Sequence, residues 1–170
     1  MAVQVVDYDS RWPALFELEL QRIRIALGDV ALRVEHMGST SVPELAAKPV
    51  IDIVLVVADS ASEDVYLPAL EQAGYVLRIR EPEWYEHRMF KRPEAETNLH
   101  VFSEGCIEID RVLTFRDWLR AHPEDRDLYA SVKRSLAETV WDSVDDYAQA
   151  KTAVILEILA RAMAGGRNDS

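Results

Sequence analysis

The sequence has a single cysteine and no long hydrophobic run. Cys106 has no partner for an intramolecular disulfide, so nothing ties the protein to an oxidising compartment. No stretch approaches the roughly 18 consecutive apolar residues that a membrane helix needs. Residues 1–12 also lack the basic segment and apolar run of a signal peptide. We therefore expect a cytoplasmic protein with no membrane partner.

Positive charge is scarce as well. The chain has 19 Lys and Arg against 30 Asp and Glu, which gives a formal net charge of −11. Proteins that bind DNA or RNA usually present a basic surface, so this balance argues against a nucleic-acid partner. Basic residues gather at 78–80 and 88–92. Each group suits either a solvated loop or a local pocket for an anion.

What the sequence does contain is the composition of an ordinary globular protein. It is 49% hydrophobic and 29% charged over 170 residues, which is enough to bury a substantial core. No internal repeat or linker divides the chain. We expect one domain over residues 1–164, followed by a flexible tail at 165–170.

The hydrophobic periodicity predicts an α+β arrangement in which mixed strands are followed by a helical C-terminal third. Ser10 is expected to cap the first helix, and Gly28 to end it. Helices are predicted over 10–27, 62–75, 114–140 (as two helices, the second beginning near Pro123) and 144–166, and strands over 30–38, 49–57, 76–82, 87–93 and 98–110.

The strand predicted over residues 49–57 is almost entirely apolar but carries one charge, Asp52. A Gly38-Ser39 turn lies a short distance upstream. Backbone N–H groups in such a turn can contact a phosphate, and a carboxylate on a neighbouring strand can hold Mg²⁺ against it. The alternative is a tight turn followed by a strand whose aspartate pairs with a basic neighbour.

Residues 35–57, EHMGSTSVPELAAKPVIDIVLVV, resemble the signature region of the GrpB-like proteins. The stretches NLHVF and FRDWLRAHPE and the Tyr129…Lys133 spacing match later parts, so the similarity covers nearly the whole chain. GrpB-like proteins look like members of the nucleotidyltransferase superfamily. The resemblance implies a nucleotidyltransferase-like fold, with a mixed sheet flanked by helices and a helical C-terminal third.

The resemblance also implies an activity. Members of the superfamily transfer a nucleoside monophosphate from a triphosphate to an acceptor, using Mg²⁺ ions held by carboxylates. By that similarity Asp52 is the catalytic carboxylate and first metal ligand, while Lys48 holds a phosphate or pairs with Asp52. The residues expected to bind the nucleotide are Gly38, Ser39, Thr40, Ser41, Lys48, Arg88 and Lys91.

The sequence departs from the superfamily pattern at Val54, which occupies the position of a second acidic residue. Alternation in NLHVF places Asn98, His100 and Phe102 on one face of a strand, so His100 can face a cleft. A histidine ligand favours Mn²⁺ or Zn²⁺ over Mg²⁺, whereas the alternative is a half-buried histidine bonded to a neighbour. The expected ligands of Mg²⁺ or Mn²⁺ are Asp52, His100 and Glu108, with Asp110, Glu35 and His36 as further candidates.

Arg116 and Arg120 share a helix face at i and i+4, which fits either a structural clamp or a contact with a ligand. Tyr129 and Lys133 have the same spacing, and the same two roles stay open for them. Two other chemistries are excluded. Cys106 lacks an activating neighbour, and HMGSTS is not the Gly-x-Ser-x-Gly elbow of a serine nucleophile.

Two functions follow from these patterns. The first is a metal-dependent nucleotidyltransferase with an unknown acceptor. The second is a non-catalytic module that binds a nucleotide or another ligand on the same fold with a decayed metal site, and Val54 favours it.

Overall fold

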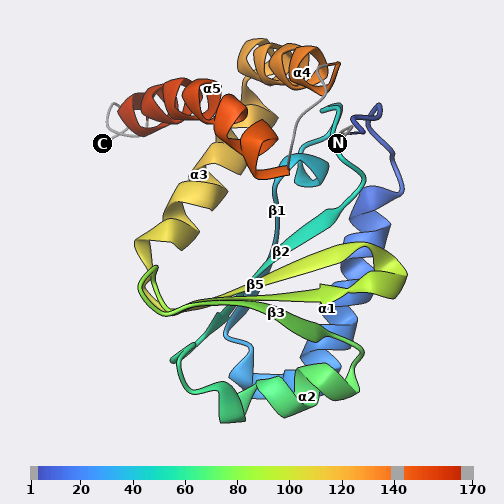
Figure 1. Cartoon of the computed structure of the whole chain (residues 1–170), viewed down its shortest axis with the longest axis vertical. Helices are drawn as coiled ribbons and strands as arrows, with labels where there is room; N and C mark the ends of the chain where they lie inside the picture. The colour runs from blue at the N-terminus through green and yellow to red at the C-terminus, as the bar shows by residue number, and fades with distance from the viewer. Residues whose placement is uncertain (1–3, 139–143, 166–170) are drawn as a thin grey trace.

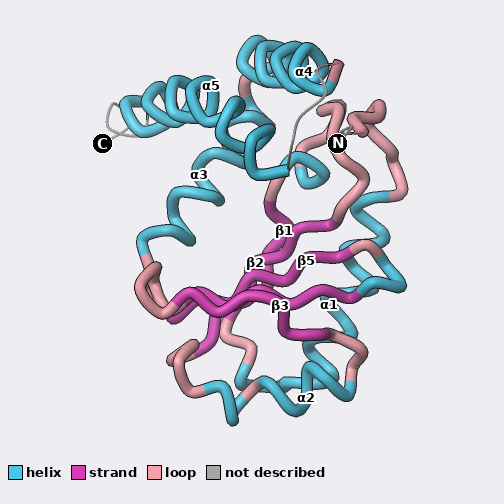
Figure 2. Tube along the Cα trace, in the orientation of Figure 1, coloured by secondary structure: helices cyan, strands magenta, loops and turns pink. Residues whose placement is uncertain are grey.

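The computed structural model describes residues 4–138 and 144–165, in which a five-stranded sheet is flanked by helices (Figures 1 and 2). The strands follow the order β1-β2-β5-β4-β3. Neighbouring strands are antiparallel except for β2 and β5, which are parallel. The elements of the sheet are β1 (Arg33–Met37), β2 (Ile51–Val57), β3 (Val76–Glu81), β4 (His87–Arg92) and β5 (Thr97–Ser103). The α-helices are α1 (Trp12–Leu27), α2 (Leu67–Gln72), α3 (Ile107–Ala121), α4 (Pro123–Ala137) and α5 (Val144–Gly165), and the short 3₁₀ turns are η1 (Gly28–Val30), η2 (Ser39–Ser41), η3 (Glu63–Val65) and η4 (Pro93–Ala95).

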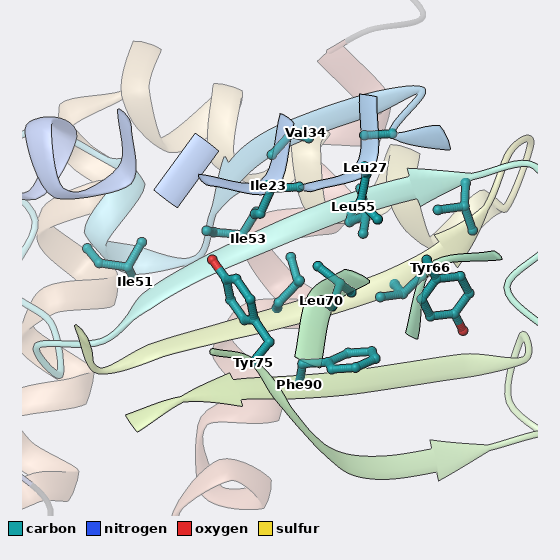
Figure 3. Packing of buried hydrophobic residues seen from close by; sticks show 14 of the residues in the cluster. Ile23, Leu27, Val34, Ile51, Ile53, Leu55, Tyr66, Leu70, Tyr75 and Phe90 are labelled. Carbon is teal, nitrogen blue, oxygen red and sulfur yellow. The ribbon is translucent and has the colours of Figure 1, made fainter. Parts of the chain in front are cut away.

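One face of the sheet packs against α1 and α2. Side chains alternate along each strand, so Ile53 of β2 and Leu99 of β5 point to this face together with Phe90 of β4. Figure 3 shows Ile23 and Leu27 of α1 and Leu70 of α2 packed over them, among a larger set of buried side chains. This layer buries the odd-numbered residues of β2. The strand is apolar almost throughout because Val54 and Val56 are buried on the opposite face as well.

The opposite face carries both a second core and the polar residues of interest. Val54 and Val56 pack with Phe102 against Ile109 and Leu113 of α3. Asp52 lies on this same face two residues before Val54, and Asn98 and His100 lie beside it on β5. The predicted grouping of Asn98, His100 and Phe102 on one face is therefore confirmed.

Helices α4 and α5 lie at one end of the molecule, and α3 runs from the sheet toward them (Figure 1). Val42 and Leu45, which follow η2, pack there against Leu119 of α3, Tyr129 of α4 and Ile158 of α5. This apolar cluster, separate from those on the two faces of the sheet, places α4 and α5 next to the start of β2. The predicted α+β class, with a mixed sheet and a helical C-terminal third, is confirmed.

Two local predictions are wrong. The strand predicted to continue to Asp110 ends at Ser103, because Gly105 with φ of 84° turns the chain and α3 begins at Ile107. Ser10 does not cap α1, which begins at Trp12 after Arg11 without a side-chain cap. Of the predicted tail, residues 166–170 lie outside the described residues. Within residues 4–138 and 144–165, no helix is long and apolar enough to cross a membrane.

Candidate functional site

Gly38 and Asp52 lie in direct contact where β1 ends. Met37, the last residue of β1, pairs with Asp52 in the antiparallel register. Gly38 has a φ of 72°, in the region that favours glycine. A Cβ atom on this residue would lie 2.9 Å from Asp52 Oδ2. Both the backbone conformation and the nearby carboxylate therefore require glycine at this position.

The η2 turn after Gly38 is held by its own hydroxyl groups. Thr40 Oγ1 donates to the carbonyl oxygen of Val50 at 3.0 Å and lies 2.9 Å from His36 Nε2. Because the only hydroxyl proton of Thr40 goes to Val50, His36 Nε2 carries a hydrogen and donates it. Burial lowers the pKa of His36 to about 4, so this histidine is neutral at pH 7. Ser41 Oγ donates to the Gly38 carbonyl oxygen and closes the turn.

Two arginines of α3 hold the same turn from outside. Arg116 Nη1 donates to the carbonyl oxygen of His36 at 2.9 Å and pairs with Glu35 at 2.9 Å. Arg120 Nε donates to the carbonyl oxygen of Ser41 at 2.9 Å. These contacts match the clamp, one of the two roles predicted for Arg116 and Arg120. The clamp fixes the turn relative to α3, and so relative to the two helices that follow.

A polar cavity of about 160 Å³ lies where η2, the start of β2, β5, α4 and α5 meet. Three of the four lysines in the chain line it, whereas the fourth, Lys91, is exposed on β4. The lining residues are Ser39, Thr40, Lys48, Val50, Asp52, Asn98, Lys133, Tyr147 and Lys151. Cationic side chains thus converge on a space that also contains the Asp52 carboxylate.

Two of these lysines are presented in the same way by two different helices. Lys133 follows Tyr129 by four residues on α4, and Lys151 follows Tyr147 by four residues on α5. This spacing places each pair on one helix face. Lys133 Nζ lies 4.7 Å from the Tyr129 ring centroid, and Lys151 Nζ lies 4.9 Å from that of Tyr147. Each tyrosine therefore supports the ammonium group of its lysine through a cation–π contact.

Burial makes the cavity lysines unusual. The Lys133 side chain is 2% exposed, and its Nζ has no hydrogen-bond partner among the described residues. Burial, followed by the charges of Lys151 and Arg134, lowers the pKa of Lys133 to about 7. Burial also lowers the pKa of Lys151, with a further contribution from Lys48 and opposition from Asp52. A buried ammonium group without a partner is costly. An anion bound in this cavity would accept a hydrogen bond from Lys133 Nζ and offset that cost.

A chain of polar contacts reaches Asp52 from the other side. Glu81 Oε1 lies 2.8 Å from His87 Nδ1, and His87 Nε2 lies 3.1 Å from His100 Nδ1. His100 Nε2 in turn lies 3.6 Å from Asp52 Oδ1. Burial lowers the pKa of His87, which is 4% exposed, and its contact with Glu81 opposes this effect. The chain crosses the sheet from β3 through β4 and β5 to β2.

The structure brings together most of the residues predicted to bind a nucleotide. Ser39, Thr40, Lys48 and Asp52 line the cavity, while Gly38 and Ser41 shape its turn. It does not bring Arg88 or Lys91 to the cavity. Arg88 is directed to the opposite face of the sheet, where its Nε donates to Glu63 at 2.6 Å. Lys91 pairs in register with Asn98 but does not line the cavity.

The predicted metal ligands are only partly gathered. Asp52 and His100 face each other, but Glu108 begins α3 and pairs with Arg111 at 3.2 Å. Across the described part of the chain, no group of three or more His, Cys, Asp or Glu side chains is placed to hold a metal ion. The other candidates are engaged elsewhere or exposed: Glu35 pairs with Arg116, His36 bonds to Thr40, and Asp110 is exposed on α3.

Val54 occupies the strand position at which a second carboxylate would be expected. Its side chain is 0% exposed and packs in the apolar cluster with Phe102 and Ile109. A carboxylate in this position would be buried among apolar groups, which is costly without a metal or another cation. The metal-binding potential of the sheet face therefore ends at Asp52 and His100.

Lys133, for which a ligand contact was one of two expected roles, lines the cavity, and so do Lys151, Asn98 and Tyr147, which no sequence pattern assigned to a site. The available signal was the placement of a lysine four residues after a tyrosine on two helices. Such a lysine shares its helix face with residues of the core, as Tyr129 and Ile158 show. A lysine on an apolar face is rare unless it is paired, so it marks a buried site.

The structural comparisons define the class of protein. Over 75% of this chain and 42% of the other, the fold matches that of Cid1, solved in complex with its short product ApU, with a TM-score of 0.54 and 10% sequence identity. The conserved protein GrpB from Enterococcus faecalis matches with a TM-score of 0.85 and 34% identity, over 95% of this chain and 98% of that chain. The fold is therefore nucleotidyltransferase-like, and at this low identity the match to Cid1 shows the fold alone.

Sequence comparison identifies the family within that class. The family model described as GrpB protein matches residues 2–161. The UPF0157 protein BH1888 of Halalkalibacterium halodurans is 60% identical over 163 residues, covering 96% of this chain and 84% of that protein. The chain belongs to the GrpB family.

Proposed function

We propose that this protein binds a nucleoside triphosphate with its phosphate groups in the lysine-lined cavity and transfers the nucleotidyl group to an acceptor. The observation that carries the proposal is the buried Lys133 Nζ without a hydrogen-bond partner, beside two further lysines and Asp52. Three cationic side chains match the charge of a polyphosphate.

The size of the cavity supports phosphate as the buried group. Its volume of about 160 Å³ is smaller than the roughly 300–1,000 Å³ of typical small-molecule pockets. Such a space suits phosphate groups rather than a whole nucleotide. The ribose and base would therefore extend beyond the lysines. Lys48, Lys133 and Lys151 would therefore contact the phosphates and would not select the base.

Asp52 and His100 fit a divalent metal ion as far as their chemistry and spacing are concerned. A carboxylate oxygen and an imidazole nitrogen face each other at 3.6 Å, and Mn²⁺ accepts both kinds of ligand. Mg²⁺ is commonly held by one or two carboxylates together with substrate phosphates, which Asp52 also allows. The bound ion would polarise a phosphoryl oxygen as a Lewis acid.

The protein side chains would stabilise charge during the transfer. In this reaction an acceptor atom forms a bond to the α-phosphorus and gives up its proton to solvent. The bond from that phosphorus to the bridging oxygen breaks, and pyrophosphate leaves with the electron pair. Lys48, Lys133 and Lys151 surround the space where that negative charge would collect. Positioned cations in a buried site are effective stabilisers of developing charge.

Val54 favours a second candidate function. With this position filled by a buried valine, the site has one strand carboxylate where the superfamily pattern has two. A binding module that retains the lysine cavity without transferring a nucleotidyl group is consistent with that arrangement. The two functions share the phosphate site and differ only in turnover.

Calorimetry and thermal unfolding with ATP, GTP, CTP and UTP, each with and without Mg²⁺ or Mn²⁺, test the proposal. We expect at least one triphosphate to bind and raise the melting temperature, with a further metal-dependent increase that Asp52→Asn abolishes. Release of pyrophosphate in the presence of candidate acceptors would separate transfer from binding alone. Absence of any response to all four triphosphates would refute both functions.

A further inference from the structure

The contacts that link Glu81, His87 and His100 have a defined direction. The carboxylate of Glu81 accepts a hydrogen bond, so His87 Nδ1 carries a hydrogen and donates it over 2.8 Å. In a neutral imidazole the other nitrogen is an acceptor. His87 Nε2 therefore accepts from His100 Nδ1, 3.1 Å away. Burial of His87 supports this neutral form, since burial disfavours a charged imidazole.

This direction determines which nitrogen of His100 faces Asp52. In the tautomer that has its hydrogen on Nδ1, His100 presents a lone pair at Nε2. That lone pair faces Asp52 Oδ1 across 3.6 Å, beyond the usual length of a hydrogen bond. Two acceptors facing each other are both satisfied by a cation between them. The opposite direction would require a second hydrogen on the buried His87, and thus a charged ring.

We propose that Glu81 and His87 are positioning residues that hold His100 in the tautomer whose Nε2 binds a divalent metal ion together with Asp52. The inference rests on the metal site of the proposed function and extends it to two residues that touch neither substrate nor metal. Histidines that bind metals usually donate their other N–H to a fixed acceptor, and such partners strengthen binding. Here the acceptor is a second imidazole, itself anchored by a carboxylate.

The nearly coplanar orientation of the two rings fits this hydrogen bond. The ring centroids of His87 and His100 lie 5.3 Å apart with an angle of 21° between their planes. His87 also contacts Phe102 and Trp84, so its ring is enclosed on several sides. A ring held in this way orients its neighbour with little freedom, as a metal ligand requires.

The test uses the metal-free protein with ¹⁵N-labelled histidine and needs no nucleotide. Long-range ¹H–¹⁵N NMR is expected to show His100 with its hydrogen on Nδ1 in the wild type, and to lose this preference in His87→Leu. Calorimetry with Mn²⁺ alone should show affinity about 10–100-fold weaker in His87→Leu and in Glu81→Ala. Glu81→Gln should retain most of the affinity, because its amide oxygen still accepts from His87.

Glu83→Ala is the matched control, since Glu83 is an exposed carboxylate in the turn that follows β3. It should leave both the tautomer and Mn²⁺ affinity unchanged. A hydrogen on His100 Nε2 in the wild type, or unchanged Mn²⁺ affinity in a folded His87→Leu variant, would overturn the inference. Lack of Mn²⁺ binding by the wild type would overturn it as well. Mn²⁺ binding with these dependences but no triphosphate binding would refute the proposed function and leave the positioning role standing.

Discussion

Gly38 and Asp52 lie so close together that a side chain at position 38 would have to displace the carboxylate of Asp52. A Cβ atom at Gly38 would lie 2.9 Å from Oδ2 and 3.3 Å from Cβ of Asp52. The turn of the Gly-Ser motif and the carboxylate of β2 are therefore one unit. Any side chain at position 38 displaces the group that we propose to bind metal.

Gly38→Ala is expected to reduce both stability and metal binding. Alanine at a positive φ costs roughly 1–2 kcal/mol, and here the clash with Asp52 adds to it. Gly105→Ala is the matched control, because Gly105 has φ of 84° but nothing within 4 Å of the added Cβ. Urea unfolding should show the larger loss in Gly38→Ala. Mn²⁺ titration should show a loss of affinity in that variant alone.

Lys133→Met is expected to stabilise the protein. A buried charge without a partner is costly, and an apolar side chain of similar size removes that cost. Even for buried ion pairs, such a replacement is often stabilising by roughly 1–4 kcal/mol. In the wild type, the pKa of Lys133 is about 7 in the folded state against a reference value of 10.5. Between these values the unfolded chain binds a proton that the folded chain does not, so wild-type stability rises with pH in this window.

The gain from Lys133→Met should therefore be larger at about pH 6 than at about pH 10, since the desolvation of the charged amine is fully present only below its folded pKa. Denaturant unfolding at both pH values measures the difference. An equal gain in stability at both pH values would contradict the burial of the Lys133 ammonium group seen in the structure.

The same substitution should weaken the binding of a polyphosphate. Charged hydrogen bonds contribute roughly 1.5–3 kcal/mol each, so Lys133→Met and Lys151→Met are each expected to reduce affinity by about 10–100-fold. Lys91→Met is the control, because Lys91 is the one lysine that does not line the cavity. Calorimetry with inorganic pyrophosphate and with ATP measures all three. Equal losses in Lys91→Met would contradict the cavity as the phosphate site.

Arg116→Met is expected to destabilise the protein by about 1–3 kcal/mol, because it leaves buried polar groups without a partner. Its guanidinium group bonds to the carbonyl oxygen of His36 and to Glu35. Arg134→Met on α4 should change stability by less than about 0.5 kcal/mol, since its ion pair with Asp7 is exposed and surface ion pairs contribute little. Chemical unfolding of both variants provides the comparison, and equal effects would argue against the clamp.

The sequence by itself determined the local features of the site. Alternation placed His100 and Asn98 on one face of a strand, and the lone charge in the apolar strand identified Asp52. The turn at Gly38-Ser39 could be recognised from the sequence because a backbone conformation with positive φ strongly favours glycine. These features depend on residues near each other in the chain, which is why pattern alone was enough.

Only the tertiary structure decided which distant residues share the site. Arg88 and Lys91 belong to a predicted basic cluster, yet neither lines the cavity, while Lys133 and Lys151 reach it from helices far along the chain. Glu108 was assigned to a strand, but Gly105 ends that strand and directs Glu108 to a helix. The packing of α4 and α5 over the start of β2 depends on long-range burial of apolar surface, which local periodicity does not specify.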